Sequence, residues 1–83
     1  MKVNKHLRDT IFEIVDNQLR NNDPPETKRT YDRLKKDGFD DFTIKQLIGQ
    51  CIMVEIWEIL HENKTFDIER YLHNLSNLPK EPF

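Results

Sequence analysis

The segment 42–62 has the hydrophobic spacing of an α-helix, but its apolar side chains change face halfway along. At 100° per residue, one apolar stripe follows the first half, and it consists of Ile44, Leu47, Ile48, Cys51 and Ile52. The apolar residues of the second half centre on nearly the opposite side, and they are Met53, Ile56, Trp57, Ile59 and Leu60. Because each apolar face must be covered by other side chains, the pattern predicts a central helix. Its second half is covered by the rest of the domain or by a second subunit.

The chain of 83 residues is long enough for one domain with a small core. A domain of this size buries only somewhat more than about 60% of its unfolded surface, so the core is marginal unless a partner shares it. Cys51 is the sole cysteine, which excludes an internal disulfide and a cysteine-rich zinc site and fits a reducing cytosol. We therefore expect residues 1–83 to form a single helical domain.

Capping and turn residues divide the chain into four predicted helices, and no segment has the alternating pattern of a strand. The first helix spans about residues 5–20. The second is predicted to begin at Pro24, with Asp23 as its N-cap and Glu26 at the reciprocal position of a capping box, and to end at Gly38.

The third and fourth helices are predicted to start in the same way, with an aromatic residue, an aspartate N-cap and a second large apolar side chain. The two sets are Phe39, Asp40 and Ile44, and Phe66, Asp67 and Tyr71. This arrangement is a hydrophobic staple. The last helix should end near Asn77, before Pro79. Because the loops are short, the sequence predicts a compact all-α domain of four helices with a long central third helix.

Charge and hydropathy give no reason to expect a nucleic-acid or membrane partner. The chain has 13 basic and 15 acidic side chains and a formal charge of −2, so it has no overall attraction to polyanions. Residues 1–6 lack the apolar stretch of a signal peptide. The apolar run 51–60 is too short for a bilayer and is interrupted by glutamates. We therefore expect a soluble, cytoplasmic protein.

Three glutamates, Glu55, Glu58 and Glu62, continue the first apolar stripe into the second half of the long helix. Like charges at this spacing cost a few tenths of a kcal/mol per pair if they are unpaired, so a basic partner is expected. Arg8 falls inside the apolar arc of the first helix, and we predict that it reaches Glu55 or Glu58. This polar network is either a solvated surface network or a polar layer at a subunit interface.

The predicted second helix carries a basic stripe of Arg29, Arg33 and Lys36, which could also face the glutamates. With the turn 37–40 and the next helix, this stripe imitates a helix-turn-helix. However, the helix that would read the bases begins with Asp41-Phe42-Thr43, an acidic and aromatic start. Since phosphate neutralisation dominates DNA binding, a DNA-binding regulator is the alternative and not the main hypothesis.

Glu58 and His61 have the Glu-x-x-His spacing that di-iron bundles use. Such a site needs a second copy of the motif and two further carboxylates, so we predict no metal, no cofactor and no catalytic residue, and keep a metal-binding enzyme as a weaker alternative. Gly49 costs about 1 kcal/mol relative to alanine inside a helix, which a close helix crossing would explain. We expect Cys51 to be a core residue and not a nucleophile.

Helix caps and core positions also form a wider pattern along nearly the whole chain. It comprises Asn17-Gln18-Leu19, Asn22-Asp23-Pro24-Pro25-Glu26-Thr27, Gly38-Phe39, Leu47-Ile48-Gly49, Glu55-Ile56, Phe66-Asp67, Arg70-Tyr71 and Leu78-Pro79. This pattern resembles small bacterial helical proteins that are known as a domain of unknown function. The resemblance implies a shared helical fold. It carries over no catalytic residue, and His61 has no counterpart in it.

These observations favour a non-catalytic helical module that acts through protein contacts, either as a homodimer or as a small adaptor. The candidate interface is the second apolar face of the long helix, represented by Met53, Ile56, Trp57 and Leu60. Tryptophan and methionine are enriched at the centres of protein interfaces. The expected partner is therefore another protein or a second copy of the chain, and neither nucleic acid nor a membrane.

Overall fold

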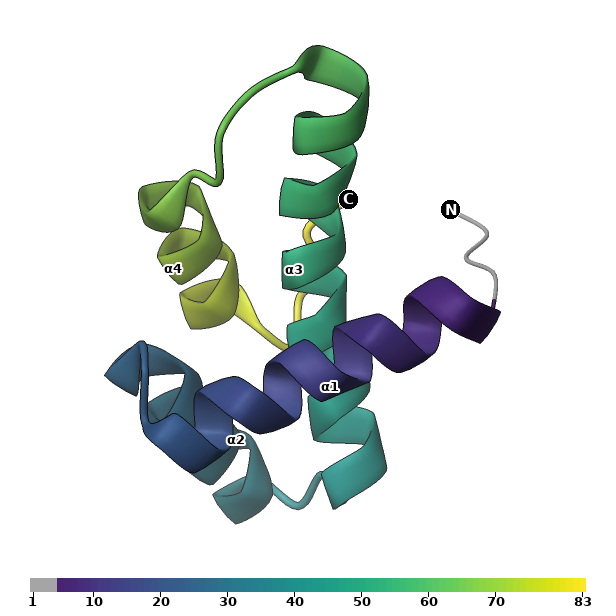
Figure 1. Cartoon of the computed structure of the whole chain (residues 1–83). Coiled ribbons are helices and arrows are strands. Elements are labelled where there is room, and N and C mark those ends of the chain that lie inside the picture. Colours follow the sequence, from purple (N-terminus) through teal and green to yellow (C-terminus); the bar gives the residue numbers. More distant parts are fainter. Residues whose placement is uncertain (1–4) are drawn as a thin grey trace.

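The computed structural model describes residues 5–83, which fold into four helices (Figure 1). The helices are α1 (Lys5–Asn21), α2 (Pro25–Lys36), α3 (Asp41–Glu62) and α4 (Ile68–Asn77). The predicted all-α, four-helix fold with a long third helix is therefore confirmed. Within residues 5–83, no helix combines the length and the apolar character that a bilayer span requires.

Helix α3 is the centre of the fold, since each of the other three helices packs against it. Figure 1 shows that α1 crosses α3 at a steep angle, whereas α4 runs back alongside α3 after the loop at its C-terminal end. The core contains residues of all four helices and Leu78 just after α4, and it consists of Ile11, Val15, Leu34, Ile44, Ile48, Cys51, Ile52, Met53, Tyr71, Leu75 and Leu78. The predicted central position of α3 is thus confirmed.

The crossing of α1 over α3 is centred on Gly49. A Cβ atom added to this buried residue would lie 2.9 Å from Cγ2 of Ile11, closer than packed carbon atoms tolerate. The absence of a side chain therefore lets the two helices approach, and the close crossing expected at Gly49 is confirmed. Two residues along, Cys51 is buried, and burial raises the pKa of its thiol to about 12. Cys51 is a core residue, as predicted.

The two predicted aspartate caps are both present. Asp40 accepts a hydrogen bond of 2.8 Å from the backbone N–H of Thr43 at the start of α3. Asp67 accepts one of 3.1 Å from the N–H of Arg70 at the start of α4. Each cap satisfies an amide that has no partner inside its own helix. The caps explain why these two helix starts could be predicted from local sequence, and at the second start Phe66 also contacts Tyr71, as the predicted staple requires.

The predicted start of α2 is wrong. The helix begins at Pro25, and its N-cap is Pro24, which has no side-chain acceptor. The backbone N–H of Asp23 donates to the carbonyl of Gln18 at 3.1 Å, so Asp23 closes the end of α1. Its carboxylate consequently lies one position too early to cap α2. The N–H of Thr27 bonds instead to the carbonyl of Pro24 at 3.1 Å.

Helix α2 ends at Lys36, slightly before the predicted end, and Gly38 adopts the predicted left-handed conformation with φ of +103°. The N–H of Phe39 then donates to the carbonyl of Leu34 at 3.1 Å, which closes the last turn. A residue with a Cβ atom would be strained in this conformation. The turn that follows directs the chain into α3.

Candidate functional site

Glu55 is a fully buried carboxylate in the second half of α3, on the side that faces α4. Arg70 of α4 binds both of its oxygens, with Nε 2.6 Å from Oε2 and Nη2 2.8 Å from Oε1. The N–H of Asp67 donates to Oε1 at 2.8 Å as well. The side-chain hydrogen bonds of Arg70 to Glu55 raise the pKa of the guanidinium above its ordinary value. Because the buried carboxylate is paired and hydrogen-bonded, it fixes the start of α4 on α3.

The predicted contact of Arg8 with Glu55 or Glu58 is wrong. Glu55 forms its ion pair with Arg70. Nζ of Lys64 lies 3.5 Å from Oε2 of Glu58, which is an ion-pair distance, but the two atoms form no hydrogen bond. Arg8 lies instead beside a pocket that Met53 also lines. Met53 is two residues from Glu55 and therefore about 160° around the helix from it, so α1 passes on the opposite side.

The four residues of the predicted polar network consequently do not form one cluster. Glu55 is buried with Arg70, Glu58 is half-buried near Lys64, and both Glu62 and Arg8 are exposed. The arc of three glutamates is thus divided by α4, which covers its first member and leaves its last member in water. Only Glu55 contributes a buried charge to the packing of the helices.

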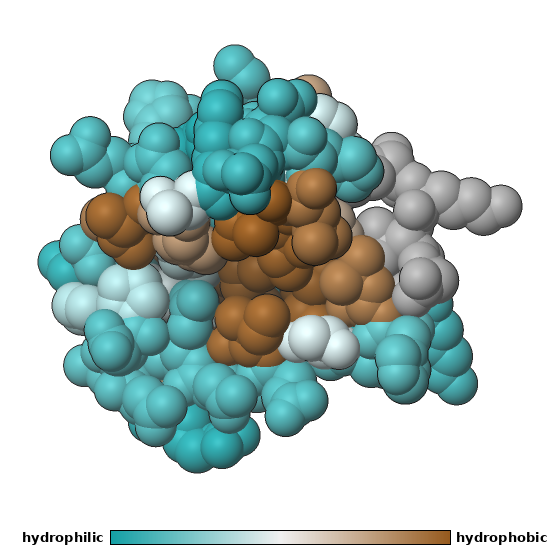
Figure 2. All heavy atoms as spheres, turned by 45° about the horizontal axis from the view of Figure 1, so that its top comes forward, coloured by the Kyte–Doolittle hydropathy of each residue, from teal (hydrophilic) through white to brown (hydrophobic). Residues whose placement is uncertain are grey.

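The four candidate interface residues, Met53, Ile56, Trp57 and Leu60, lie on one face of α3 at helical spacing. Burial falls steadily along this face, because Met53 is buried, Ile56 is half-buried, Trp57 is 38% exposed and Leu60 is 70% exposed. In Figure 2 the C-terminal end of α3 is turned towards the viewer, and hydrophobic residues gather in an area with hydrophilic ones above and below it. An apolar area of this kind is typical of an interaction site.

Trp57 does not pack into the core of the monomer. Its ring stacks on the ring of His61, with centroids 4.7 Å apart and planes 18° apart. The same histidine places Nδ1 3.1 Å from the carbonyl oxygen of Trp57. These contacts hold the indole along the helix surface, where it keeps an exposed edge. His61 is therefore a neighbour of the apolar face.

Among the described residues, the fold brings no further metal ligand close to Glu58 and His61. Across the part of the chain that the structure describes, no three histidine, cysteine, aspartate or glutamate side chains gather where they could share a metal ion. Glu58 faces Lys64, and His61 faces Trp57. The metal-binding alternative therefore has no geometric observation in its favour.

All three residues of the basic stripe of α2 are exposed, but one of them is held by hydrogen bonds within the fold. Arg33 donates to the carbonyl of Leu78 at 2.8 Å and to that of Leu75 at 3.0 Å, so its guanidinium satisfies carbonyls at the C-terminal end of α4. Arg29 and Lys36 are exposed. Since Arg33 is committed to the fold, only two cations of the stripe are available to a phosphate backbone.

The first turn of α3, which a helix-turn-helix would present to DNA, is occupied by internal contacts. The hydroxyl of Tyr31 donates to Asp41 at 2.5 Å and lowers the pKa of that carboxyl. Lys45 lies 2.8 Å from Asp16 and 3.4 Å from Asp41, and the Asp16 contact raises the pKa of Lys45. Lys45 thus pairs with two carboxylates, so its positive charge is not free for the phosphates of DNA. The DNA-binding alternative stays an untested prediction.

A buried polar cluster that the sequence analysis missed joins three helices. The hydroxyl of Thr27 donates to Oε1 of Gln18 at 2.7 Å, and the hydroxyl of Tyr71 donates to the same oxygen at 2.6 Å. Burial raises the pKa of Tyr71 to about 12. Because the three residues satisfy one another, the cluster orients α1, α2 and α4. Its only local signal is the polar Thr27 on the inner stripe of α2.

No family model matches the chain, and comparisons with curated proteins and with solved structures likewise give no match. The resemblance to bacterial helical proteins therefore stays a prediction. Any functional conclusion must come from the geometry of the molecule.

Proposed function

We propose that this protein is a non-catalytic interaction module that pairs with a second copy of itself through the exposed apolar face of α3. The observation that carries the proposal is the position of α4. It packs on the Glu55 side of α3, so the opposite side keeps Trp57 38% exposed and Leu60 70% exposed. A tryptophan beside large aliphatic side chains is the usual composition of an interface centre.

A second copy is the partner that the charge distribution favours. In a two-fold pair the same patch meets itself, so a charged patch would repel its own copy. The face that contains Met53, Ile56, Trp57 and Leu60 has no charged member. The nearest buried charge, Glu55, is already neutralised by Arg70. The patch is therefore compatible with its own copy.

The size of the face indicates a reversible dimer. A standard interface covers about 800 Å² of each partner, which is more than Trp57 and Leu60 can supply alone. We therefore expect neighbouring residues of α1 to take part and the dissociation constant to lie in the micromolar range or above. A cytoplasmic site of action belongs to the same proposal, since the free, buried Cys51 suits a reducing compartment.

The test is solution mass by light scattering between about 10 µM and about 1 mM, a range that covers weak dimers. Leu60→Lys should give the mass of one chain where the wild type approaches twice that mass. The matched control is Phe42→Glu at the other end of α3, since Phe42 is 62% exposed. Each new charge suits its end of the helix dipole, so both variants should fold.

The wild type and Phe42→Glu should dimerise alike. Phe42 lies 18 residues from Leu60 and therefore about 27 Å along the helix, outside the proposed interface. A wild type of single-chain mass over the whole range would contradict the proposal. Equal masses for the two variants would contradict the assigned face.

A further inference from the structure

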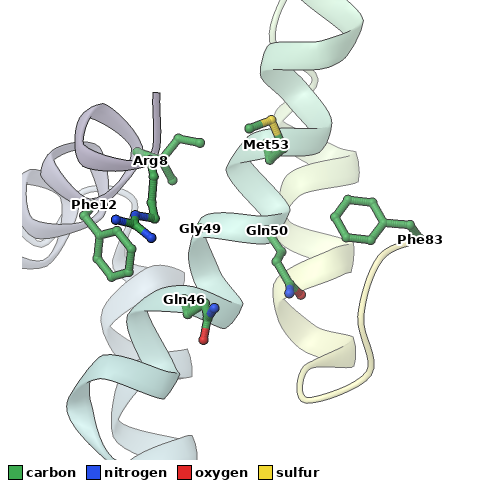
Figure 3. Close-up of a pocket in the computed structure, with 8 residues that line it drawn as sticks. Arg8, Phe12, Gln46, Gly49, Gln50, Met53 and Phe83 are labelled. Atoms are coloured by element: carbon green, nitrogen blue, oxygen red, sulfur yellow. The ribbon is translucent and has the colours of Figure 1, made fainter. Parts of the chain in front are cut away.

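A pocket opens between α1, α3 and the C-terminal tail, beside the crossing at Gly49 (Figure 3). Its volume is about 240 Å³. Figure 3 shows Arg8 and Phe12 on one side and Phe83 on the other, with Gln46 and Gln50 of α3 between them. Met53 also lines it. The pocket therefore combines apolar walls with one cation and two amides, a composition typical of sites for small ligands.

One end of the pocket carries an available positive charge. Within residues 5–83, the side chain of Arg8 makes no ion pair and no hydrogen bond, and it is exposed. The nearby carboxylates of Asp16 and Asp41 are both held by Lys45, at 2.8 and 3.4 Å. A guanidinium in this situation is suited to bind a carboxylate with two parallel hydrogen bonds.

The other end offers an unsatisfied hydrogen-bond acceptor. Nε2 of Gln50 donates to Oε1 of Glu81 at 3.4 Å, and because a carboxylate accepts only, this contact sets the orientation of the amide. Oε1 of Gln50 is buried and has no donor among the described residues. A ligand group that donates a hydrogen bond would satisfy this oxygen, whereas a second carboxylate would be repelled by Glu81.

We propose that this pocket binds a small aromatic acid whose ring carries a hydrogen-bond donor opposite the carboxylate. The carboxylate pairs with Arg8, the ring lies between Phe12, Met53 and Phe83, and the donor reaches Gln50. A volume of about 240 Å³ lies just below the range of drug-sized sites, which begins at about 300 Å³, so it suits a ligand with a single ring. Of the four α3 residues assigned to the proposed dimer contact, this site includes only Met53.

The probe is 4-hydroxyphenylacetate, titrated into the full ¹⁵N-labelled chain and followed by amide chemical shifts. A ligand of this size reaches a dissociation constant of about 1 mM. We expect the largest shifts at Gly49, Gln50 and Met53. Phenylacetate, which lacks the donor, and 4-hydroxyphenethylamine, which lacks the carboxylate, should each bind about tenfold more weakly or worse.

Two variants test the assignment, and a third is the control. Arg8→Met should weaken binding by about tenfold or more while the fold persists, since Arg8 has no partner to lose within residues 5–83. Gln46→Trp at an exposed position should fill the pocket and abolish binding. Arg29→Met, at an exposed arginine of α2, should change nothing.

The proposal is overturned if about 10 mM probe, well above the expected dissociation constant, shifts no amide near the pocket. It is also overturned if Arg8→Met binds the probe as tightly as Arg29→Met does. Dimer dissociation by Leu60→Lys should leave probe binding intact, so the two proposals fail independently.

Discussion

The two halves of α3 solve the same problem of burial in different ways. In the first half, Ile44, Ile48 and Cys51 are inaccessible to water, and the ion pairs of Lys45 lie near the surface and not among them. In the second half, the inward position belongs to Glu55, which is buried with Arg70, while Leu60 on the other side is exposed. The first half therefore stabilises the fold through apolar burial. In the second half, the Glu55–Arg70 ion pair determines on which side of α3 helix α4 packs.

This difference explains why the second half keeps an exposed apolar face. A buried ion pair contributes little net stability but is costly to mismatch, so it serves to select one packing arrangement. Arg70 and the N–H of Asp67 can satisfy Glu55 only when α4 lies on that side. The opposite side, with Trp57, stays partly exposed.

The largest expected effect comes from breaking the charged contact of the second half. Glu55→Ala should destabilise the fold by about 3 kcal/mol, the lower end of the range for removing one partner of a buried ion pair. Arg70 and the N–H of Asp67 lose their acceptor, but Arg70 is 30% exposed and can be partly solvated by water. Chemical denaturation measures this change. Glu58→Ala is the matched control, and its expected cost is within about 1 kcal/mol, since its contact with Lys64 is near the surface. Equal losses in the two variants would show that the buried pair has no special role.

The next effect concerns the crossing that covers the first half. Gly49→Ala gains about 1 kcal/mol of helix propensity but places Cβ 2.9 Å from Cγ2 of Ile11. Overpacking costs about 1–3 kcal/mol, so the net destabilisation should be about 1 kcal/mol. The check is a double-mutant cycle with Ile11→Ala. In that background the clash is absent, and Gly49→Ala should be neutral or stabilising; an unchanged penalty would place the strain elsewhere.

The sequence predicted the elements of this fold better than their mutual orientation. Hydrophobic spacing and local caps located all four helices, because Asp40 and Asp67 act within four residues of themselves. The prediction for Asp23 was wrong because this residue lies between two helix ends. Its backbone N–H makes the hydrogen bond that closes α1, so its side chain does not cap α2. A helical projection does not show to which helix end such a residue belongs.

The partner of Glu55 lay beyond the reach of periodicity for a different reason. A projection gives the angle of each side chain on its own helix, but not the side on which another helix crosses. Because α1 crosses at Gly49, Arg8 could not reach Glu55, and Arg70 took that position. The apolar face with Trp57 and Leu60 was easier to predict, since it follows from spacing alone, whereas its use as an interface stays a prediction. The local sequence pattern does not indicate which partner would cover this face.

A smaller stability effect separates the exposed face from the core. The sequence-based expectation for Trp57→Ala is a loss of about 3–5 kcal/mol if the ring is buried, but Trp57 is 38% exposed and stacks on His61. The loss in the monomer should therefore be about 1 kcal/mol, from the part of the ring that is covered. Thermal unfolding at low concentration measures it. The main consequence should appear in solution mass at high concentration, and a variant that dimerises normally would remove Trp57 from the interface.

The smallest effect concerns the cap that begins the buried half of α3. The hydrogen bond from the N–H of Thr43 lowers the pKa of Asp40 below its ordinary value. A carboxyl whose pKa is lower in the folded state stabilises the fold above its unfolded pKa of about 4 and loses that contribution as the pH falls through the folded value. Asp40→Ala should therefore lower the melting temperature at neutral pH, and the difference from wild type should shrink on acidification below about pH 4.

Asp23→Ala should leave the melting temperature unchanged at both pH values, because the Asp23 backbone, and not its side chain, makes the bond that closes α1. If Asp23→Ala proved as harmful as Asp40→Ala, the carboxylate of Asp23 would have to support α2 after all, and the start of that helix would need to be reassigned.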